Sequence, residues 1–330
     1  MSAAEGQSEV FAPGLLRGQA ALVTGGGTGL GKATAHELAR CGAAVTIVGR
    51  REQVLEDAAR EIAAELGGGV GGGPVAGGGP AAEGGPVAGG GAIDWVAGDV
   101  REREQAQRMV GSVLERHGRL DLLVNNAGGQ FFSPAELIAD KGWRAVWRLN
   151  VEGTLNMAEA AYELAFAGGG GGAVVGGEGE GGAGAGAGGG TGAGGGTIVN
   201  VTLSPHNGMP GMAHSGAARA TVEALTRELA QRWREAGVTV IAVAAGHFDT
   251  EVLAKYPDSV RAGAARTVPL QRLGSAQEHA WLVALLASPL GRSFNGSTIT
   301  LDGARDNWCG PWPPPGLADE AGEVPVEERR

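Results

Sequence analysis

The sequence predicts a single α/β domain built on a doubly wound parallel sheet, with helices on both faces of the sheet. Two observations support this fold class. Short apolar runs alternate along the chain with longer segments whose apolar residues recur at steps of three and four. A glycine-rich turn separates the first apolar run from the segment after it. Sheets of this kind bind ligands beyond the carboxyl ends of their strands, so function is expected at that edge.

The expected strands and helices follow one another from residue 20 to residue 301. Strands are expected at 20–24, 45–48, 93–97, 120–124, 198–201, 238–244 and 297–301. Helices are expected at 30–41, 53–66, 104–117, 143–166, 277–287 and, before the sixth strand, from about residue 215 to 236. Because strands alternate with helices throughout, the strands are expected to run parallel.

Two glycine-rich blocks interrupt this pattern. Glycine supplies 63 of the 330 residues, against a usual share of about 7%, and residues 67–91 and 168–196 hold much of the excess. Neither block has the apolar residues to offset its chain entropy, so both are expected to be flexible, dispensable insertions. The domain is expected to span residues 17–305. Residues 306–330 then form a Trp- and Pro-containing tail that packs onto this or a neighbouring subunit.

The composition excludes several classes of partner. The formal net charge is −10, which disfavours nucleic acid, because phosphate binding needs a basic footprint. No run of about 18 apolar residues is present, so no membrane span is expected. Cys41 and Cys309 are the only cysteines, so no disulfide framework and no metal site are expected. The first residues lack the basic start and apolar run of a signal peptide, and we expect a cytoplasmic protein.

The turn after the first strand has the pattern Thr-Gly-x-x-x-Gly-x-Gly, with Thr24, Gly25, Gly29 and Gly31 in the fixed positions. Between a strand and a helix, such glycines let the backbone approach a pyrophosphate and aim the helix N-terminus at it. Alone, the pattern is only a glycine-rich turn in a glycine-rich protein. Its position between a strand and a helix favours a nucleotide site.

The second strand ends at Arg50 and Arg51. An acidic residue at this distance from the glycines hydrogen-bonds the ribose of NAD, whereas an arginine suits the 2′-phosphate of NADP. Thr28 and Lys32 are near enough in sequence to assist at the same phosphate. The alternative is that two solvated arginines simply open a helix.

Together these motifs resemble those of the short-chain dehydrogenase/reductase family, which has a Rossmann-like fold. Its marks appear in order, and the resemblance covers residues 17–305 apart from the two glycine-rich blocks. They are the glycine turn at 24–31, Asp99 after the third strand, Asn125-Asn126-Ala127-Gly128 after the fourth, Asn150 in the long helix, and the segment from Gly246 to Thr250, where Ala245 replaces the usual proline.

The resemblance implies a site for NADP(H). Asp99 and Val100 would then lie by the adenine, and Thr250 near the nicotinamide amide. The full set of implied cofactor residues is Gly25, Thr28, Gly29, Leu30, Gly31, Arg50, Arg51, Asp99, Val100, Asn126, Ala127, Gly128, Arg219, Gly246, Phe248 and Thr250. The resemblance also implies a homo-oligomer, either a dimer or a tetramer.

The chain departs from the family at the catalytic pair. Ser215 and Arg219 stand where the family usually has Tyr-x-x-x-Lys, and residues four apart project from the same side of a helix. The family's catalytic serine would fall among residues 202–204, with Thr202 and Ser204 as candidates. The segments 128–136, 141–143 and 214–219 look most like those of trans-2-enoyl-CoA reductases, with 2,4-dienoyl-CoA reductases as near relatives. Both reduce carbon–carbon double bonds of acyl-CoA thioesters with NADPH.

The chemistry of these side chains favours the same reaction. Ketone reduction puts a proton on the carbonyl oxygen, which suits a tyrosine; serine is a much weaker acid, and arginine does not deprotonate. Enoyl reduction instead leaves an enolate, whose oxygen needs hydrogen-bond donors. We therefore expect Ser215 to bond the enolate oxygen, Arg219 to hold the nicotinamide ribose, and Asn150 to order a water or a backbone group. Ser204 is the fourth candidate catalytic residue, after Ser215, Arg219 and Asn150.

Several roles stay open at this point. His214 is either a proton donor or a structural residue, and Phe131 and Phe132 either line an acyl pocket or pack in the core. The expected partner is a small acyl thioester, delivered by CoA or by a carrier protein. Two rival functions are a carbonyl reductase or alcohol dehydrogenase with an atypical proton donor, and a catalytically silent nucleotide-binding regulatory protein.

Overall fold

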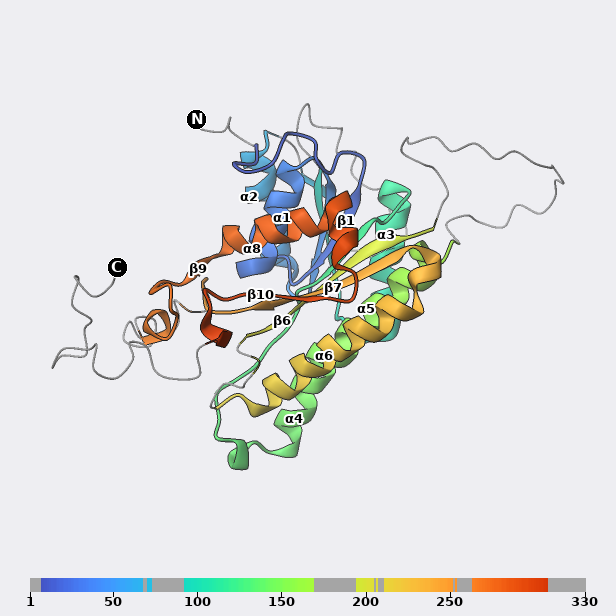
Figure 1. Cartoon of the computed structure of the whole chain (residues 1–330). Coiled ribbons are helices and arrows are strands. Elements are labelled where there is room, and N and C mark those ends of the chain that lie inside the picture. The colour runs from blue at the N-terminus through green and yellow to red at the C-terminus, as the bar shows by residue number, and fades with distance from the viewer. Residues whose placement is uncertain are drawn as a thin grey trace, which may run out of the picture.

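The computed structural model describes residues 7–67, 70–72, 92–168, 194–204, 206, 211–251, 253 and 263–307. Within these residues, eight parallel strands form one sheet in the order β10-β7-β6-β5-β1-β2-β4-β3 (Figure 1). A separate parallel pair joins β8 (Phe248–Asp249) to β9 (Gly274–Ser275). The predicted doubly wound parallel sheet is confirmed.

Strands and helices alternate along most of the described chain. The strands of the large sheet are β1 (Ala20–Thr24), β2 (Ala44–Gly49), β3 (Val70–Gly72), β4 (Ile93–Ala97), β5 (Leu122–Asn125), β6 (Gly196–Leu203), β7 (Val238–Ala245) and β10 (Thr298–Leu301). The α-helices are α1 (Gly29–Arg40), α2 (Glu52–Glu65), α3 (Arg103–His117), α4 (Asp140–Trp147), α5 (Gly153–Ala161), α6 (Ala213–Arg232) and α8 (Ala276–Ala287). Shorter helical turns are η1 (Ala135–Leu137), η2 (Arg148–Glu152), η3 (Tyr162–Phe166), η4 (Arg234–Ala236), η6 (Pro289–Phe294) and η7 (Arg305–Asn307).

Alternate residues of each central strand face opposite helical layers. In β1, Ala21 and Val23 pack with α1, α2 and α8, whereas Ala20 and Leu22 pack with α3, α5 and α6. Figure 1 shows α1, α2 and α8 together on one side of the sheet, and α5 and α6 along the other. Because both faces are covered, the central strands are mostly apolar on both sides, and this makes them recognisable as apolar runs.

The parallel register brings the ends of the strands to one edge. Thr24, the last residue of β1, pairs with Val48 near the end of β2. Leu203, the last residue of β6, pairs with Ala245 at the end of β7. The turns that carry the sequence motifs all leave the sheet from this edge, so motifs far apart in the sequence are brought together there.

The long helix predicted at 143–166 is less regular than expected. It begins at Asp140 and reaches Phe166 through two π-helical turns, η2 and η3. Asn150 lies inside η2, and π turns within α-helices are frequent at functional sites. The sequence shows only the helical period, because the extra residue of a π turn is accommodated by packing against neighbouring elements.

The first glycine-rich block contributes a short strand that the sequence analysis did not anticipate. Residues 70–72 form β3 and pair with β4 at the edge of the sheet. The rest of that block, most of the second block and the tail beyond Asn307 lie outside the described residues, so the insertions, the domain bounds and the tail stay predictions. No helix among the described residues is long and apolar enough to cross a membrane.

Candidate active site

A cleft of about 610 Å³ opens at the carboxyl edge of the sheet. Every predicted cofactor residue lines this cleft except Gly31, which lies behind the glycine turn. The cleft has two ends, which differ in their residues. The glycine-turn end is formed by residues 25 and 27–30 together with Arg50, Arg51 and Asp99. The Arg219 end is formed by Gly128, Gln130, Leu203 and Arg219.

The glycine turn has a backbone that only glycine accommodates. Gly25 and Gly29 adopt φ values of +65° and +54°, a region that L side chains rarely enter. A Cβ on Gly31 would lie 2.4 Å from the Gly25 carbonyl oxygen, so the turn and the first residues of α1 can touch only through glycine. Thr28 precedes α1 without a capping hydrogen bond from its side chain, and no acidic residue stands in the first turn. An uncapped helix N-terminus of this kind suits an anion.

The loop after β5 is braced against this turn. The Thr24 hydroxyl accepts hydrogen bonds from the backbone N–H groups of Asn126 (3.0 Å) and Ala127 (2.9 Å) and donates to the Val124 carbonyl (3.2 Å). The Asn126 side chain donates to the Thr24 carbonyl at 3.0 Å. Thr24 and Asn126 therefore connect the two motifs rigidly, which explains why both occur at the ends of neighbouring strands.

One carboxylate at the glycine-turn end, that of Asp99, is paired with an arginine side chain. Asp99 lines the cleft, and the Arg101 Nε lies 2.9 and 3.0 Å from its two carboxylate oxygens. These hydrogen bonds, and to a smaller extent the charge of Arg50, hold the pKa of Asp99 below its usual value. Arg50 and Arg51 are exposed and line the cleft, whereas Lys32 pairs with Glu61 at 2.6 Å. The sequence analysis missed Arg101, although it stands two residues after Asp99.

Arg219 is a buried cation at the other end of the cleft. Its side chain donates to the Val201 carbonyl at 2.6 Å, and its Nε has no partner among the described residues. Burial lowers the pKa of Arg219 to about 10, so the guanidinium stays charged at neutral pH. A Cβ on Gly128 would lie 2.1 Å from Arg219 Nη2, so the last glycine of the Asn-Asn-Ala-Gly motif makes room for this side chain.

Ser215 and Asn150 both act on the short loop after Gly128. The buried Ser215 hydroxyl donates to Gln130 Oε1 at 3.0 Å. Asn150 donates to the carbonyls of Gly129 (2.9 Å) and Val146 (2.7 Å), and it accepts from the Gly129 N–H at 3.3 Å. Asn150 therefore orders a backbone group, one of its two predicted roles. Gln130 is exposed in the cleft and was missed, although it follows the Asn-Asn-Ala-Gly motif by only two residues.

The Ser204 side chain does not take part in the hydrogen bonds of Ser215, Gln130 and Asn150. Its hydroxyl donates to a carboxylate oxygen of Asp302, and Ser204 does not line the cleft. The Thr202 hydroxyl donates to Glu223 at 2.9 Å, so both candidates for the family's catalytic serine have other partners. Thr202 and Leu203 both line the cleft, whereas Ser204, the first residue after β6, does not.

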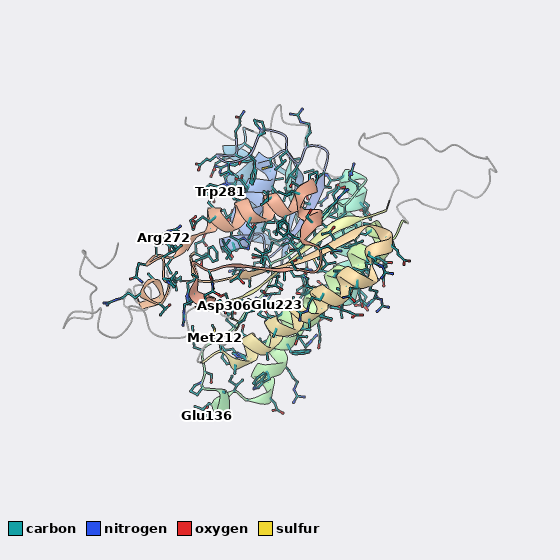
Figure 2. All side chains as sticks on the ribbon, in the orientation of Figure 1. Glu136, Met212, Glu223, Arg272, Trp281 and Asp306 are labelled. Atoms are coloured by element: carbon teal, nitrogen blue, oxygen red, sulfur yellow. The ribbon has the colours of Figure 1, made fainter. Side chains whose placement is uncertain are left out.

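A further contact holds the segment that follows β6. His206 Nε2 lies 2.9 Å from Glu223, and His206 Nδ1 lies 2.6 Å from Asp306. Figure 2 shows Glu223 on α6 and Asp306 beside one another at the end of the sheet. The hydrogen bonds and charges of the two carboxylates raise the pKa of His206, even though burial acts in the opposite direction. The contact joins α6 to the last described turn of the chain.

The aromatic residues near α6 divide between packing and the cleft. The His214 ring packs edge-on against Phe131 (centroids 4.4 Å apart) and Trp143 (6.0 Å). Burial lowers the pKa of His214, so its ring is neutral at pH 7, and it does not line the cleft. Phe132 does line the cleft, together with the apolar residues Leu149 and Met212. The arrangement favours a structural role for His214 and Phe131, and a ligand-facing position for Phe132.

Taken together, the cleft fits a nicotinamide dinucleotide. One end offers glycine backbone and an uncapped helix N-terminus to phosphates. At the other end the charged guanidinium of Arg219 lines the cleft, where it suits a hydroxyl or carbonyl of a bound group.

Comparison with known proteins agrees with this geometry. The "short chain dehydrogenase" family matches residues 19–71 and 83–178, and the family described as "Enoyl-(Acyl carrier protein) reductase" matches residues 187–304. The chain is 30% identical to a peroxisomal 2,4-dienoyl-CoA reductase of Arabidopsis thaliana, over 89% of this chain and 86% of the relative.

Two solved structures extend the likeness. A citronellol catabolism dehydrogenase of Pseudomonas aeruginosa is 36% identical with a TM-score of 0.68, covering 90% of this chain and 98% of that one. A short chain dehydrogenase of Burkholderia cenocepacia, solved in complex with NADP, is 26% identical with a TM-score of 0.68, covering 88% of this chain and 99% of that one. Because sequence, fold and cleft agree over most of its length, the chain belongs to the short-chain dehydrogenase/reductase family of oxidoreductases, which bind a nicotinamide cofactor.

Proposed function

We propose that this protein is an NADPH-dependent reductase of the C2=C3 double bond of enoyl thioesters. One observation carries the proposal. Where the family usually has a tyrosine and a lysine, the Ser215 hydroxyl is bonded to the cleft-lining Gln130 beside the buried cation of Arg219. Tyr162, the one tyrosine among the described residues, stacks on Trp233 with centroids 4.4 Å apart and does not line the cleft.

Hydrogen-bond donors without an acid suit the formation of an enolate. When bound, NADPH supplies the hydride that is added to C3. Charge then develops on the thioester oxygen, and preorganised donors at that position lower the barrier. Gln130 lines the cleft and accepts from Ser215 through Oε1, so the N–H groups of its amide are not used in that contact. We assign the Gln130 amide and the Ser215 hydroxyl to the thioester oxygen as donors. For this the single hydroxyl proton of Ser215 turns from Gln130 Oε1 to the substrate oxygen, and water completes the reaction by protonating C2.

Arg219 and Asn150 support this chemistry in different ways. We assign Arg219 to the nicotinamide ribose, because its charged guanidinium lines the cleft against Gly128. Asn150 is a positioning residue, since its side-chain amide bonds backbone atoms of Gly129 and Val146. By holding Gly129, it fixes the direction in which Gln130 enters the cleft.

The preference for NADPH rests on the charges at the glycine-turn end. Arg50 and Arg51 both line the cleft, and Asp99 has its own arginine partner. The NADP-bound relative supports the same cofactor. We assign the phosphates to the glycine turn and the 2′-phosphate to the two arginines.

The substrate class rests on the cleft and on the relatives. Phe132, Leu149 and Met212 supply an apolar wall that suits an acyl chain. The similarity to a 2,4-dienoyl-CoA reductase adds dienoyl thioesters to the substrates that we propose to compare. A homo-oligomer, as a dimer or tetramer, stays part of the proposal on the family resemblance.

One assay tests the proposed function. Oxidation of NADPH is followed with crotonyl-CoA, 2,4-hexadienoyl-CoA and acetoacetyl-CoA, and cofactor binding is measured in parallel. We expect turnover of one or both conjugated thioesters and little turnover of the ketone. Efficient reduction of acetoacetyl-CoA alone would identify a carbonyl reductase. Binding of NADPH without turnover of any of the three would support a silent nucleotide-binding protein, and either result would overturn the proposal.

A further inference from the structure

The glycine-turn end of the cleft contains an apparent conflict of charge. Asp99 lines the same cleft as Arg50 and Arg51, to which we assign the 2′-phosphate of NADPH. A free carboxylate at that position would repel the phosphate, because like charges a few ångströms apart interact unfavourably even in water. Some other group must therefore offset the charge of Asp99 if the end is to accept a phosphate.

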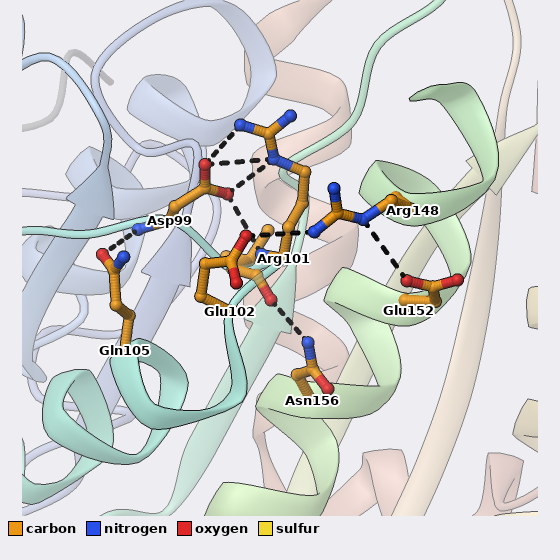
Figure 3. A network of polar contacts seen from close by, with 8 residues as sticks. Asp99, Arg101, Glu102, Gln105, Arg148, Glu152 and Asn156 are labelled. Atoms are coloured by element: carbon orange, nitrogen blue, oxygen red, sulfur yellow. Dashed lines mark hydrogen bonds and ion pairs between the residues drawn. The ribbon is translucent and has the colours of Figure 1, made fainter. Parts of the chain in front are cut away.

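Arg101 is placed to offset it. Figure 3 shows its guanidinium against the Asp99 carboxylate, with Nε bonded to both oxygens at 2.9 and 3.0 Å. The backbone N–H of Arg101 donates to the same carboxylate at 3.1 Å, and the backbone N–H of Asp99 donates to Gln105 at 2.9 Å. The pair is thus fixed at side chain and backbone. Arg101 does not itself line the cleft, so it stands behind Asp99 as seen from a ligand.

The next carboxylate along the chain is also paired. Glu102 lies 3.0 Å from Arg148, and Arg148 lies 3.7 Å from Glu152 (Figure 3). Asn156 donates to the Val100 carbonyl at 3.0 Å and holds the connecting backbone. Asp99 and Glu102 are therefore matched with Arg101 and Arg148, and Arg50 and Arg51 line the cleft as charges presented to a ligand.

We propose that Arg101 determines the cofactor preference indirectly, by neutralising Asp99 so that Arg50 and Arg51 present a net positive site to a 2′-phosphate. This inference rests on the proposed preference for NADPH and adds a positioning residue to it. Arg101 acts through Asp99, and its removal weakens binding only of ligands that carry the 2′-phosphate.

The test uses binding of two adenosine nucleotides that differ in this phosphate. Titration calorimetry measures the dissociation constants of 2′,5′-ADP and 5′-AMP for the full chain. Arg101→Gln should weaken 2′,5′-ADP about tenfold while 5′-AMP changes by less than about twofold. Arg103→Gln is the matched control, because Arg103 begins α3 and pairs with Glu163 at 2.8 Å and with Glu159, away from the cleft. It should change neither constant.

Three further variants separate this role from a structural one and from direct phosphate binding. Asp99→Asn alone should strengthen 2′,5′-ADP binding, and Asp99→Asn with Arg101→Gln should restore the affinity that Arg101→Gln loses. Arg101→Lys should retain most of the wild-type ratio because it keeps the charge. A loss that persists in the double variant would overturn the inference, since Arg101 would then contact the phosphate itself. A loss of 2′,5′-ADP binding in Asp99→Asn would also overturn it.

The inference and the proposed cofactor preference fail in different ways. If wild type binds 2′,5′-ADP and 5′-AMP equally, the NADPH preference fails, and the inference with it. If wild type prefers 2′,5′-ADP and Arg101→Gln leaves the ratio unchanged, the inference alone fails. Circular dichroism melting of each variant establishes that it is folded, and Asp99→Asn gives an independent result should Arg101→Gln not fold.

Discussion

The two ends of the cleft differ in what shapes them. At the glycine-turn end, the turn itself offers backbone to a ligand, and its shape follows from glycines that stand close together in the sequence. At the Arg219 end, polar side chains bond to partners on separate elements: Ser215 to Gln130, and Asn150 to Gly129. A binding site made of backbone is therefore readable from a motif, whereas a reacting site made of side chains depends on which partners the fold brings together.

Among the substitutions that test this difference between the two ends, Ser215→Ala should have the largest effect on turnover. Ser215→Ala removes one donor to the thioester oxygen, and turnover of the preferred enoyl thioester should fall by about 10²–10³. The dissociation constant of NADPH should change little, because the hydroxyl faces Gln130 rather than the glycine turn. Thr221→Ala is the control, since that hydroxyl on the same helix donates to the Ala217 carbonyl at 3.0 Å. Full activity in Ser215→Ala would show that the hydroxyl is only a packing residue.

The contact between α1, which follows the glycine turn, and α8 should be destabilised at acid pH. His279 of α8 is buried, its Nδ1 lies 3.2 Å from the Thr34 hydroxyl, and its ring packs against Phe248. Burial lowers the pKa of His279 to about 4, from 6.5. Between pH 6.5 and 4 the unfolded chain binds a proton that the folded chain does not. The free energy of unfolding should therefore fall by about 3 kcal/mol across this window as the pH is lowered.

A matched variant isolates the contribution of His279. Burial also lowers the pKa values of His36, His214 and His247, so the informative quantity is the difference between wild type and His279→Gln. Urea unfolding at several pH values should show that the variant loses less stability between pH 6.5 and 4 than wild type does. Parallel pH profiles for the two proteins would contradict the assignment.

Cofactor choice gives a smaller, more specific effect at the same end. Arg50→Gln with Arg51→Gln removes both charges assigned to the 2′-phosphate, and charge-assisted hydrogen bonds of this kind contribute roughly 1.5–3 kcal/mol. The ratio of NADPH to NADH affinity should fall roughly ten- to a hundredfold, as measured by fluorescence titration. Arg60→Gln on α2 is the control, because that exposed arginine pairs with Glu56 at 2.7 Å. An unchanged ratio in the double variant would remove the basis for NADPH.

The smallest effect is expected far from both ends. Deletion of residues 75–89 and 171–191 spares β3 and takes away most of the two glycine-rich blocks. Each deletion leaves roughly a third of its block, and each halving of a loop changes its closure free energy by only about 0.6 kcal/mol. The unfolding free energy should therefore change by only about 1 kcal/mol per block, and NADPH binding should be kept. Thermal unfolding and titration measure the two quantities. A large loss of either would mean that the blocks contribute to the folded domain.

Much of the fold was predictable because the signals are local. The apolar runs of β1 and β7 are buried along their whole length, and the glycines at 25, 29 and 31 are required by backbone geometry within one turn. β3 was not predictable, because its Val-Gly-Gly sequence has neither periodicity nor β-branched enrichment beyond one residue. It is a strand only because the edge of β4 is available to pair with it.

The sequence by itself determined the order of strands and helices, the glycine turn, and the residues that line the glycine-turn end, since each of these depends on neighbours in the chain. The tertiary structure alone decided that Ser204 bonds Asp302, that Ser215 meets Gln130, and that Asn150 holds Gly129. The physical reason is the range of the interactions. Backbone conformation is set within a few residues, whereas a side-chain hydrogen bond depends on elements that the fold brings within about 3 Å of each other.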